Sequence, residues 1–237
     1  MTDHAVTNEA RWLDARRKLL AREKALTDLQ EEVAEERRRL PWVKVEKDYA
    51  FDTPDGRRTL PELFGGRSQL IVYHFMFSPD WEAGCTGCSF LADHIDGANT
   101  HLKHHDVTWI AVSRAPLEKL QAYRARMGWK FPWVSSQGSD FNYDYHVSFT
   151  RDEVAKGEAF YNFETTKIGD MEDLHGTSVF VKDADGAIYH TYSAYARGDE
   201  RSLGTYMWLD ITPKGRDEGA KGNLTGWVKR HDEYGDA

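Results

Sequence analysis

Two cysteines, Cys85 and Cys88, are the residues whose type and spacing most directly suggest chemistry. They are the only cysteines among 237 residues, and Thr86 and Gly87 separate them. With no further cysteine available, the pair cannot belong to a larger disulfide framework. In a reducing compartment, two cysteines at this spacing are either redox-active or bound to a metal.

The surrounding pattern places this pair at the start of a helix. The apolar run from Leu70 to Phe77 predicts a central strand buried on both faces, and Ser89 to His104 can be helical. Free backbone N–H groups and the positive end of a helix dipole would stabilise a thiolate on Cys85. Cys88 lies one turn further along, where it could attack a mixed disulfide on Cys85 and release the substrate. We therefore expect Cys85 to be the attacking thiolate and Cys88 the resolving thiol, with Thr86 and Gly87 tuning the reduction potential.

Further elements indicate an α/β protein. A second buried strand and a helix opened by proline follow the first helix, which favours a parallel strand pair. An Asp-Gly turn near the end of the sequence predicts an antiparallel hairpin, whereas the stretch before that hairpin reads mostly as loop. The expected elements are a strand at 49–51, a turn at Asp55-Gly56, a helix at 61–64, a strand at 107–112, a helix at 116–127, a strand candidate at 129–134, loop at 135–176, and hairpin strands at 178–182 and 187–192.

The two ends of the chain differ from this central part. Arg11 to Leu40 lacks Gly and Pro and repeats an apolar residue every seven positions, which predicts a long amphipathic helix that packs on its own domain or on a dimer mate. Beyond Gly215 the sequence is polar and Gly-rich, so a loosely ordered tail is expected. We therefore expect a helical arm at 1–40, one domain at 41–212, and a tail at 213–237.

The overall composition excludes several partners. The net charge of -8, with both signs interspersed, argues against nucleic acid. Met1 to Ala10 has no apolar core of signal-peptide length, and no run approaches the roughly 18 apolar residues of a membrane span. A cytoplasmic protein without a cofactor is expected.

Several stretches resemble known families. Trp81 to Cys88 resembles the thioredoxin active-site stretch, which has a Trp four residues before its first Cys, and Asp55 to Phe77 resembles the N-terminal part of peroxiredoxin-like and thioredoxin-like domains. Nearly the whole chain is similar to a bacterial thioredoxin-like family of unassigned function, number 899 in the domain-of-unknown-function series. The stretches that carry this similarity are Leu40-Pro41-Trp42-Val43, Tyr73-His74-Phe75-Met76-Phe77, Phe131-Pro132-Trp133-Val134-Ser135-Ser136, Asp140-Phe141-Asn142-Tyr143-Asp144 and Thr191-Tyr192-Ser193-Ala194-Tyr195-Ala196-Arg197-Gly198.

This resemblance implies a thioredoxin-like three-layer α/β fold with a mixed central sheet. It also implies a dithiol–disulfide oxidoreductase that acts on a protein or small-molecule disulfide and is recharged by a cellular thiol reductant. Trp81, Gly176 and Thr177 would support the site or bind substrate.

Two departures from thioredoxin affect this interpretation. Thr177 stands where thioredoxins place a cis-proline, so a cis bond cannot be assumed there. Pro79 stands six residues before Cys85, where thioredoxins carry a buried acid. Proton transfer to and from Cys88 would therefore need another group or water.

Zinc binding is one alternative to redox chemistry. Cys85 and Cys88, followed by His101 and His105, match the spacing of a C2H2 zinc finger. Ala92 and Ala98, however, occupy the positions of the apolar residues that form the small core of such a finger. We expect His94, His101, His104 and His105 to be solvated helix residues, and His74 to be a core residue.

A thiol peroxidase is the nearest functional alternative, because a thiolate at a helix start can attack peroxide and a second cysteine can resolve the sulfenic acid. Peroxiredoxins place Pro seven residues and Thr or Ser three residues before that cysteine, whereas this chain has Ser78 and Glu82. A non-catalytic binding protein of the same fold is the third class, and the two intact cysteines argue against it.

Overall fold

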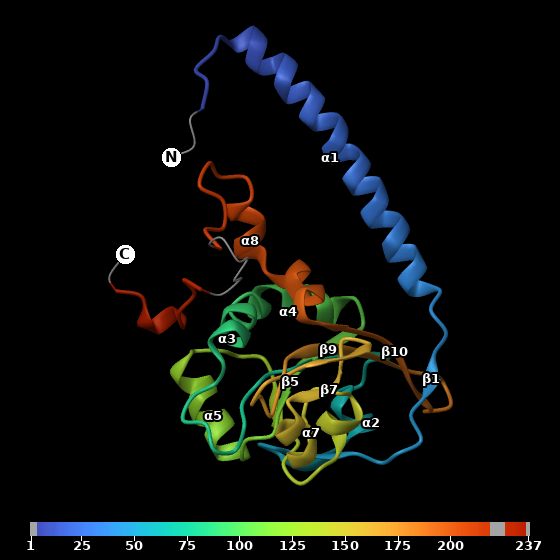
Figure 1. The fold of residues 1–237 in the computed structure, drawn as a ribbon. Coiled ribbons are helices and arrows are strands. Elements are labelled where there is room, and N and C mark those ends of the chain that lie inside the picture. The colour runs from blue at the N-terminus through green and yellow to red at the C-terminus, as the bar shows by residue number, and fades with distance from the viewer. Residues whose placement is uncertain (1–3, 219–225, 236–237) are drawn as a thin grey trace. The chain divides into compact units, whose positions relative to one another are not determined.

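The computed structural model describes residues 4–218 and 226–235 (Figure 1). The chain forms two compact units, Met1–Pro41 and Trp42–Ala237, and each is considered by itself.

The first unit is built around one long helix, α1 (Glu9–Arg38). Asn8 caps its start, with the side-chain oxygen 3.0 Å from the Arg11 N–H that donates to it. Trp12, Leu19 and Leu26 of the seven-residue repeat remain 51–56% exposed. The expected long N-terminal helix is confirmed, and it displays its apolar repeat on the surface.

The second unit contains a mixed eight-stranded sheet of order β1-β10-β9-β4-β5-β6-β2-β3. β4, β5 and β6 run parallel, whereas β9 is antiparallel to β4 and β10 is antiparallel to β9. The expected mixed central sheet is therefore confirmed. Its strands are β1 (Val43–Lys44), β2 (Ala50–Thr53), β3 (Gly56–Thr59), β4 (Gln69–His74), β5 (Val107–Ser113), β6 (Trp133–Ser135), β9 (Gly176–Lys182) and β10 (Ile188–Tyr195).

Helices cover both faces of this sheet, and Figure 1 shows α3 and α4 on one side of the strands and α2 on the other. Along β4, Leu70 and Val72 enter the core on the α2 side, whereas Tyr73 enters the core on the α3 side. The helices are α2 (Leu60–Leu63), α3 (Thr86–Ala92), α4 (Ile95–His104), α5 (Leu117–Arg126), α6 (Phe141–Asp144), α7 (Arg151–Lys156) and α8 (Gly204–Leu209), with 3-10 turns η1 (Ala196–Ser202) and η2 (His231–Glu233).

The stretch 135–176, expected to be mostly loop, is more structured than the sequence indicates. It contains α6, α7 and the hairpin of β7 (Glu158–Tyr161) with β8 (Glu164–Lys167). These elements are four to six residues long and bury a small separate core that includes Val147, Phe149 and Tyr161. Elements of that length leave too few residues for a clear period, which explains why the pattern missed them.

The C-terminal segment also differs from expectation. Val228 is buried, and Trp227 packs against the same core as α3. Residues 226–235 therefore form part of the second unit's packing, where the sequence predicted a loosely ordered tail. Within the described residues, no helix has the length and apolar character needed to cross a membrane.

Candidate active site

The loop between β4 and α3 presents Cys85 as the N-cap residue of α3. The Cys85 N–H donates to the carbonyl of Met76 at 3.1 Å, which ties the loop back to the chain leaving β4. The Cys85 carbonyl accepts hydrogen bonds from the Ser89 N–H at 2.9 Å and from the Ser89 hydroxyl at 2.8 Å. The strand, the loop and the first turn of the helix thus fix the backbone of Cys85.

Gly84 allows this loop to lie close against the core. A Cβ atom at this position would stand 2.7 Å from Cε1 of Phe75 and 3.0 Å from Cε1 of Tyr123. Both rings belong to the buried cluster under α3 and α5, so they have little room to move. Glycine is required before Cys85 because of this close approach.

The surroundings of Cys85 favour its thiolate. The thiol of Cys88 donates a hydrogen bond to Cys85, the backbone N–H groups of Cys88 and Gly87 do the same, and the charge of Arg230 adds to the effect; against burial, they lower the pKa of Cys85 to about 6. Cys85 is half-buried and borders open space. It therefore combines access with a large thiolate fraction at neutral pH.

Cys88 has the opposite character. It is 2% exposed, and its Sγ accepts a hydrogen bond from the N–H of Met76 at 3.4 Å. Burial, together with the bond and charge of Cys85, raises the pKa of Cys88 well above its usual range, although a hydrogen bond from the Tyr73 hydroxyl opposes this. The two thiols therefore differ, because the pKa of Cys85 is lowered and that of Cys88 is raised.

A cavity of about 320 Å³ lies beside the two thiols. Cys85, Gly87 and Cys88 line it, whereas Trp81 and Thr86, which the sequence also suggested, do not. Trp81 is half-buried against the α3–α5 core, and its carbonyl accepts a hydrogen bond from Nζ of Lys119 at 2.9 Å. The remaining lining residues are Tyr73, Phe90, Leu91, His175, Ala196, Arg197, Asp199, Glu200 and Leu203.

Asp199 is the lining residue that sequence reasoning missed. It sits in η1, is 4% exposed, and its Oδ2 has no hydrogen-bond partner among the described residues. Burial raises the pKa of this carboxyl to about 7, partly offset by a hydrogen bond from the side chain of Thr177. Asp199 follows the Thr191–Gly198 stretch that carries part of the family resemblance, the one signal that pointed near it.

Gly176 and Thr177 open β9 between β4 and β10. A Cβ on Gly176 would lie 2.6 Å from Cδ1 of Tyr195, so this position too needs glycine. The peptide bond between Gly176 and Thr177 is trans. Thr177 reaches the cavity indirectly, through its hydrogen bond to Asp199.

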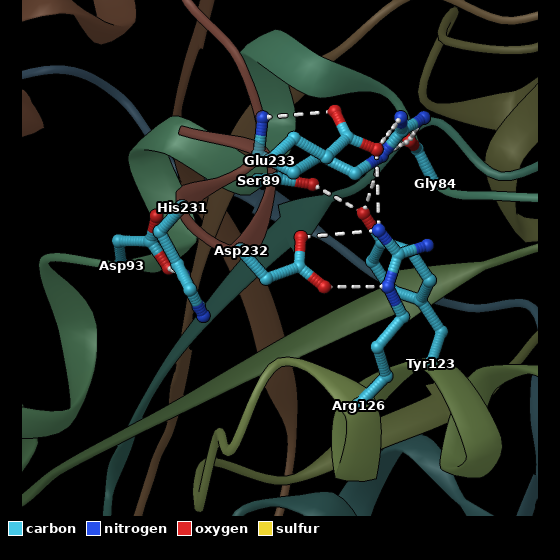
Figure 2. A network of polar contacts seen from close by, with 9 residues as sticks. Gly84, Ser89, Asp93, Tyr123, Arg126, His231, Asp232 and Glu233 are labelled. Atoms are coloured by element: carbon cyan, nitrogen blue, oxygen red, sulfur yellow. Dashed lines mark hydrogen bonds and ion pairs between the residues drawn. The ribbon is translucent and has the colours of Figure 1, made fainter. Parts of the chain in front are cut away.

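The segment 226–235 is hydrogen-bonded to the loop that carries Cys85 through Arg230. Figure 2 shows Gly84 and Tyr123, two residues that accept its hydrogen bonds. Arg230 donates from Nη2 to the carbonyl of Gly84 at 2.8 Å and from Nε to the hydroxyl of Tyr123 at 2.8 Å. Nδ1 of His231 lies 2.7 Å from Oδ1 of Asp93, and Nε of Arg126 lies 2.7 Å from Oδ2 of Asp232. Both pairs are visible in Figure 2. Arg230, which is 146 positions from Gly84 in the sequence, is therefore hydrogen-bonded to the loop that carries Cys85.

The histidines of the zinc-finger spacing lie elsewhere. His101 and His105 are exposed on and just after α4, whereas Cys88 is buried. Across residues 4–218 and 226–235, no group of three or more His, Cys, Asp or Glu side chains is arranged to hold a metal ion.

The strand order and the Cys-x-x-Cys pair at a helix start define a thioredoxin-like α/β protein. The chain belongs to the family described as "Bacterial protein of unknown function (DUF899)", which matches residues 1–234. Both findings confirm the family and fold expected from the sequence.

Solved structures of similar fold include a peroxidoxin, a peroxiredoxin and a thiol:disulfide interchange protein by name. Peroxidoxin BcpB from Mycobacterium tuberculosis is 14% identical, with 70% of this chain and 95% of that chain covered and a TM-score of 0.44. Xanthomonas campestris peroxiredoxin Q is 13% identical, with 66% and 86% covered and a TM-score of 0.42. A candidate thiol:disulfide interchange protein DsbE from Chlorobium tepidum is 12% identical, with 73% and 99% covered and a TM-score of 0.41. Among curated protein sequences, none matches this chain.

Proposed function

We propose that this protein is a dithiol–disulfide oxidoreductase that uses Cys85 and Cys88. The observation that carries the proposal is the placement of the two thiols: Cys85 is the half-buried N-cap residue of α3, Cys88 is 2% exposed one turn further along, and both line one cavity. In agreement with this placement, the pKa of Cys85 is lowered to about 6, while that of Cys88 is raised. Pairs of titratable groups whose environments drive their pKa values apart mark the division of chemical roles in a site.

The reaction would proceed in two exchanges. The Cys85 thiolate attacks one sulfur of a substrate disulfide, forms a Cys85–substrate disulfide, and expels the other substrate sulfur as a thiolate. Cys88 then attacks Cys85 Sγ, which releases the second substrate thiolate and leaves a Cys85–Cys88 disulfide. The protein gives up two electrons and the substrate gains them, so a cellular thiol reductant must restore the dithiol.

Comparing disulfide exchange with peroxide reduction tests the proposal. Reduction of insulin disulfides and of hydrogen peroxide would be measured for the wild type, Cys85→Ser and Cys88→Ser. We expect exchange to be lost in Cys85→Ser and to stop as a mixed disulfide in Cys88→Ser. Fast peroxide turnover that depends on Cys85, with negligible exchange, would instead assign the protein to the peroxidases.

The surroundings of Cys85 favour exchange over peroxide reduction. Peroxide reduction needs positioned donors that stabilise charge on the departing oxygen. Ser78 occupies the position where peroxiredoxins place Pro, and its hydroxyl donates to Asp173. Glu82, at the position of the peroxiredoxin Thr or Ser, is exposed. Disulfide exchange needs chiefly a thiolate, access and a good leaving thiol.

The proposal extends to compartment and assembly. A dithiol that must be kept reduced suits the cytoplasm, where cellular thiols supply electrons.

The exposed Trp12, Leu19 and Leu26 of α1 support a homodimer formed through this helix, because an apolar stripe is stabilised when another surface covers it.

A further inference from the structure

We propose that Asp199 is the proton acceptor for Cys88, and that it receives this proton directly or through one water in the cavity. The inference rests on the proposed function, because it concerns the second exchange, in which Cys88 must lose its proton before it attacks Cys85. Asp199 would thus supply the acid–base group that Pro79 cannot provide.

Geometry brings the two groups to one cavity. Cys88, Tyr73 and Asp199 all line the space of about 320 Å³ beside Cys85. The Tyr73 hydroxyl is hydrogen-bonded to Cys88, and the charges of both Cys88 and Asp199 raise the pKa of Tyr73, so the tyrosine lies near both. Oδ2 of Asp199 has no hydrogen-bond partner among the described residues and is therefore free to accept a proton.

Oδ2 of Asp199 makes no hydrogen bond to a described residue, although several titratable groups surround the carboxyl. The titratable and charged groups around it are His175, Tyr73, Cys85, Cys88, Tyr161, Tyr195, Arg197, Glu200 and Arg201. Nε2 of His175 lies 3.8 Å from Oδ2, beyond hydrogen-bond distance, and donates instead to the carbonyl of Ala196 at 3.2 Å. Burial lowers the pKa of His175, which favours its neutral form.

The charge state of Asp199 suits this role. Its pKa of about 7 means that both protonation states are populated at neutral pH. A group with its pKa near the operating pH makes an efficient general base and can return the proton afterwards.

The proton and electrons balance in the proposed step. The Cys88 S–H bond breaks and its proton moves to the carboxylate of Asp199. The Cys88 thiolate then forms a bond to Cys85 Sγ, and the Cys85–substrate S–S bond breaks. The departing substrate thiolate takes the electron pair of that bond and is protonated by Asp199 or by water.

Reaction of the full-length reduced protein with 5,5′-dithiobis(2-nitrobenzoate) separates the two exchanges. Attack by Cys85 releases one coloured thiolate, and attack by Cys88 on the resulting mixed disulfide releases a second. Because this leaving thiolate needs no proton, the second phase reports deprotonation of Cys88. Stopped-flow traces from pH 5 to 9 would be compared for the wild type, Asp199→Asn, His175→Gln, and Glu158→Gln as an exposed control on β7.

We expect Asp199→Asn to keep the first phase and to slow the second by about 100-fold at pH 8. The rise of the wild-type second phase near pH 7 should disappear in Asp199→Asn and persist in Glu158→Gln. An infrared carboxylic-acid band that titrates near pH 7 and is missing from Asp199→Asn would give the same assignment without turnover.

Three results would overturn the inference or its basis. A second phase in Asp199→Asn with the wild-type rate and pH profile overturns the role of Asp199 alone. Loss of the pH-dependent step in His175→Gln, but not in Asp199→Asn, assigns the proton to His175. Failure of the wild type to release either coloured thiolate overturns the proposed function itself.

Discussion

Replacing Cys88 by Ala should make Cys85 a weaker acid. The hydrogen bond from the Cys88 thiol is the largest influence that lowers the pKa of Cys85. At a pKa of about 6, roughly nine in ten Cys85 side chains are thiolate at pH 7, against about 3% for an ordinary cysteine. A hydrogen bond to a charged group contributes about 1.5–3 kcal/mol, so its loss should move the midpoint of Cys85 ionisation upward by about one to two pH units.

The assay is the rate of iodoacetamide alkylation from pH 4 to 10, with the modified residue identified by mass spectrometry. The wild type should be labelled at Cys85 with a midpoint near 6. Cys88→Ser is the matched control, because a hydroxyl can still donate to the thiolate and should retain part of the effect. A Cys88→Ala midpoint equal to that of the wild type would refute this account of the thiolate, and preferential labelling of Cys88 in the wild type would reverse the two roles.

Four further predictions follow from particular contacts. Gly84→Ala should lower the free energy of unfolding by about 1–3 kcal/mol through overpacking. Gly97→Ala should not lower it, because a Cβ atom at position 97 has no neighbour within contact distance. Urea unfolding of both variants checks this, and equal stabilities would contradict it. Arg230→Met should raise the alkylation midpoint of Cys85 because a positive charge is lost, while the exposed Lys229→Met should leave it unchanged. The pKa of Asp199 is higher in the folded protein than in the unfolded chain, so its contribution to stability is present at low pH and is lost as pH rises through about 7. Asp199→Asn should remove up to about 4 kcal/mol of the difference between the free energies of unfolding at pH 4 and pH 8, measured with urea. An unaltered difference would count against the raised pKa. A chain beginning at Pro41 should lose the dimer in light scattering or lose thermal stability, and retention of both would exclude a role for α1.

The sequence was most informative where a pattern is local. The apolar run that becomes β4, the cysteine pair at the start of α3, and the Asp185-Gly186 turn between β9 and β10 are each readable within about ten residues. They were enough to place Cys85 and Cys88 at one end of a helix and to predict an antiparallel hairpin, whereas the mixed central sheet was expected from the family resemblance. The single expected helix from Ser89 to His104 is in fact two, α3 and α4.

The parts of the site that escaped prediction depend on contacts between distant residues. Asp199 lies in the run Arg197-Gly198-Asp199-Glu200-Arg201, which reads as a solvated surface because four of its five residues are charged. Asp199 is nevertheless buried, because η1 packs beside the cysteines and lines their cavity. Arg230 lies 146 positions from Gly84, so no local pattern could connect them.

The bond between Arg230 and Gly84 also bears on how the protein is synthesised. A growing chain contains the cysteine loop long before the ribosome adds Arg230, 146 residues later. Until then the carbonyl of Gly84 lacks its guanidinium partner, and Cys85 lacks one of the charges that favour its thiolate. The part of the acidity of Cys85 that comes from the charge of Arg230 can therefore arise only after residues 226–235 have been synthesised.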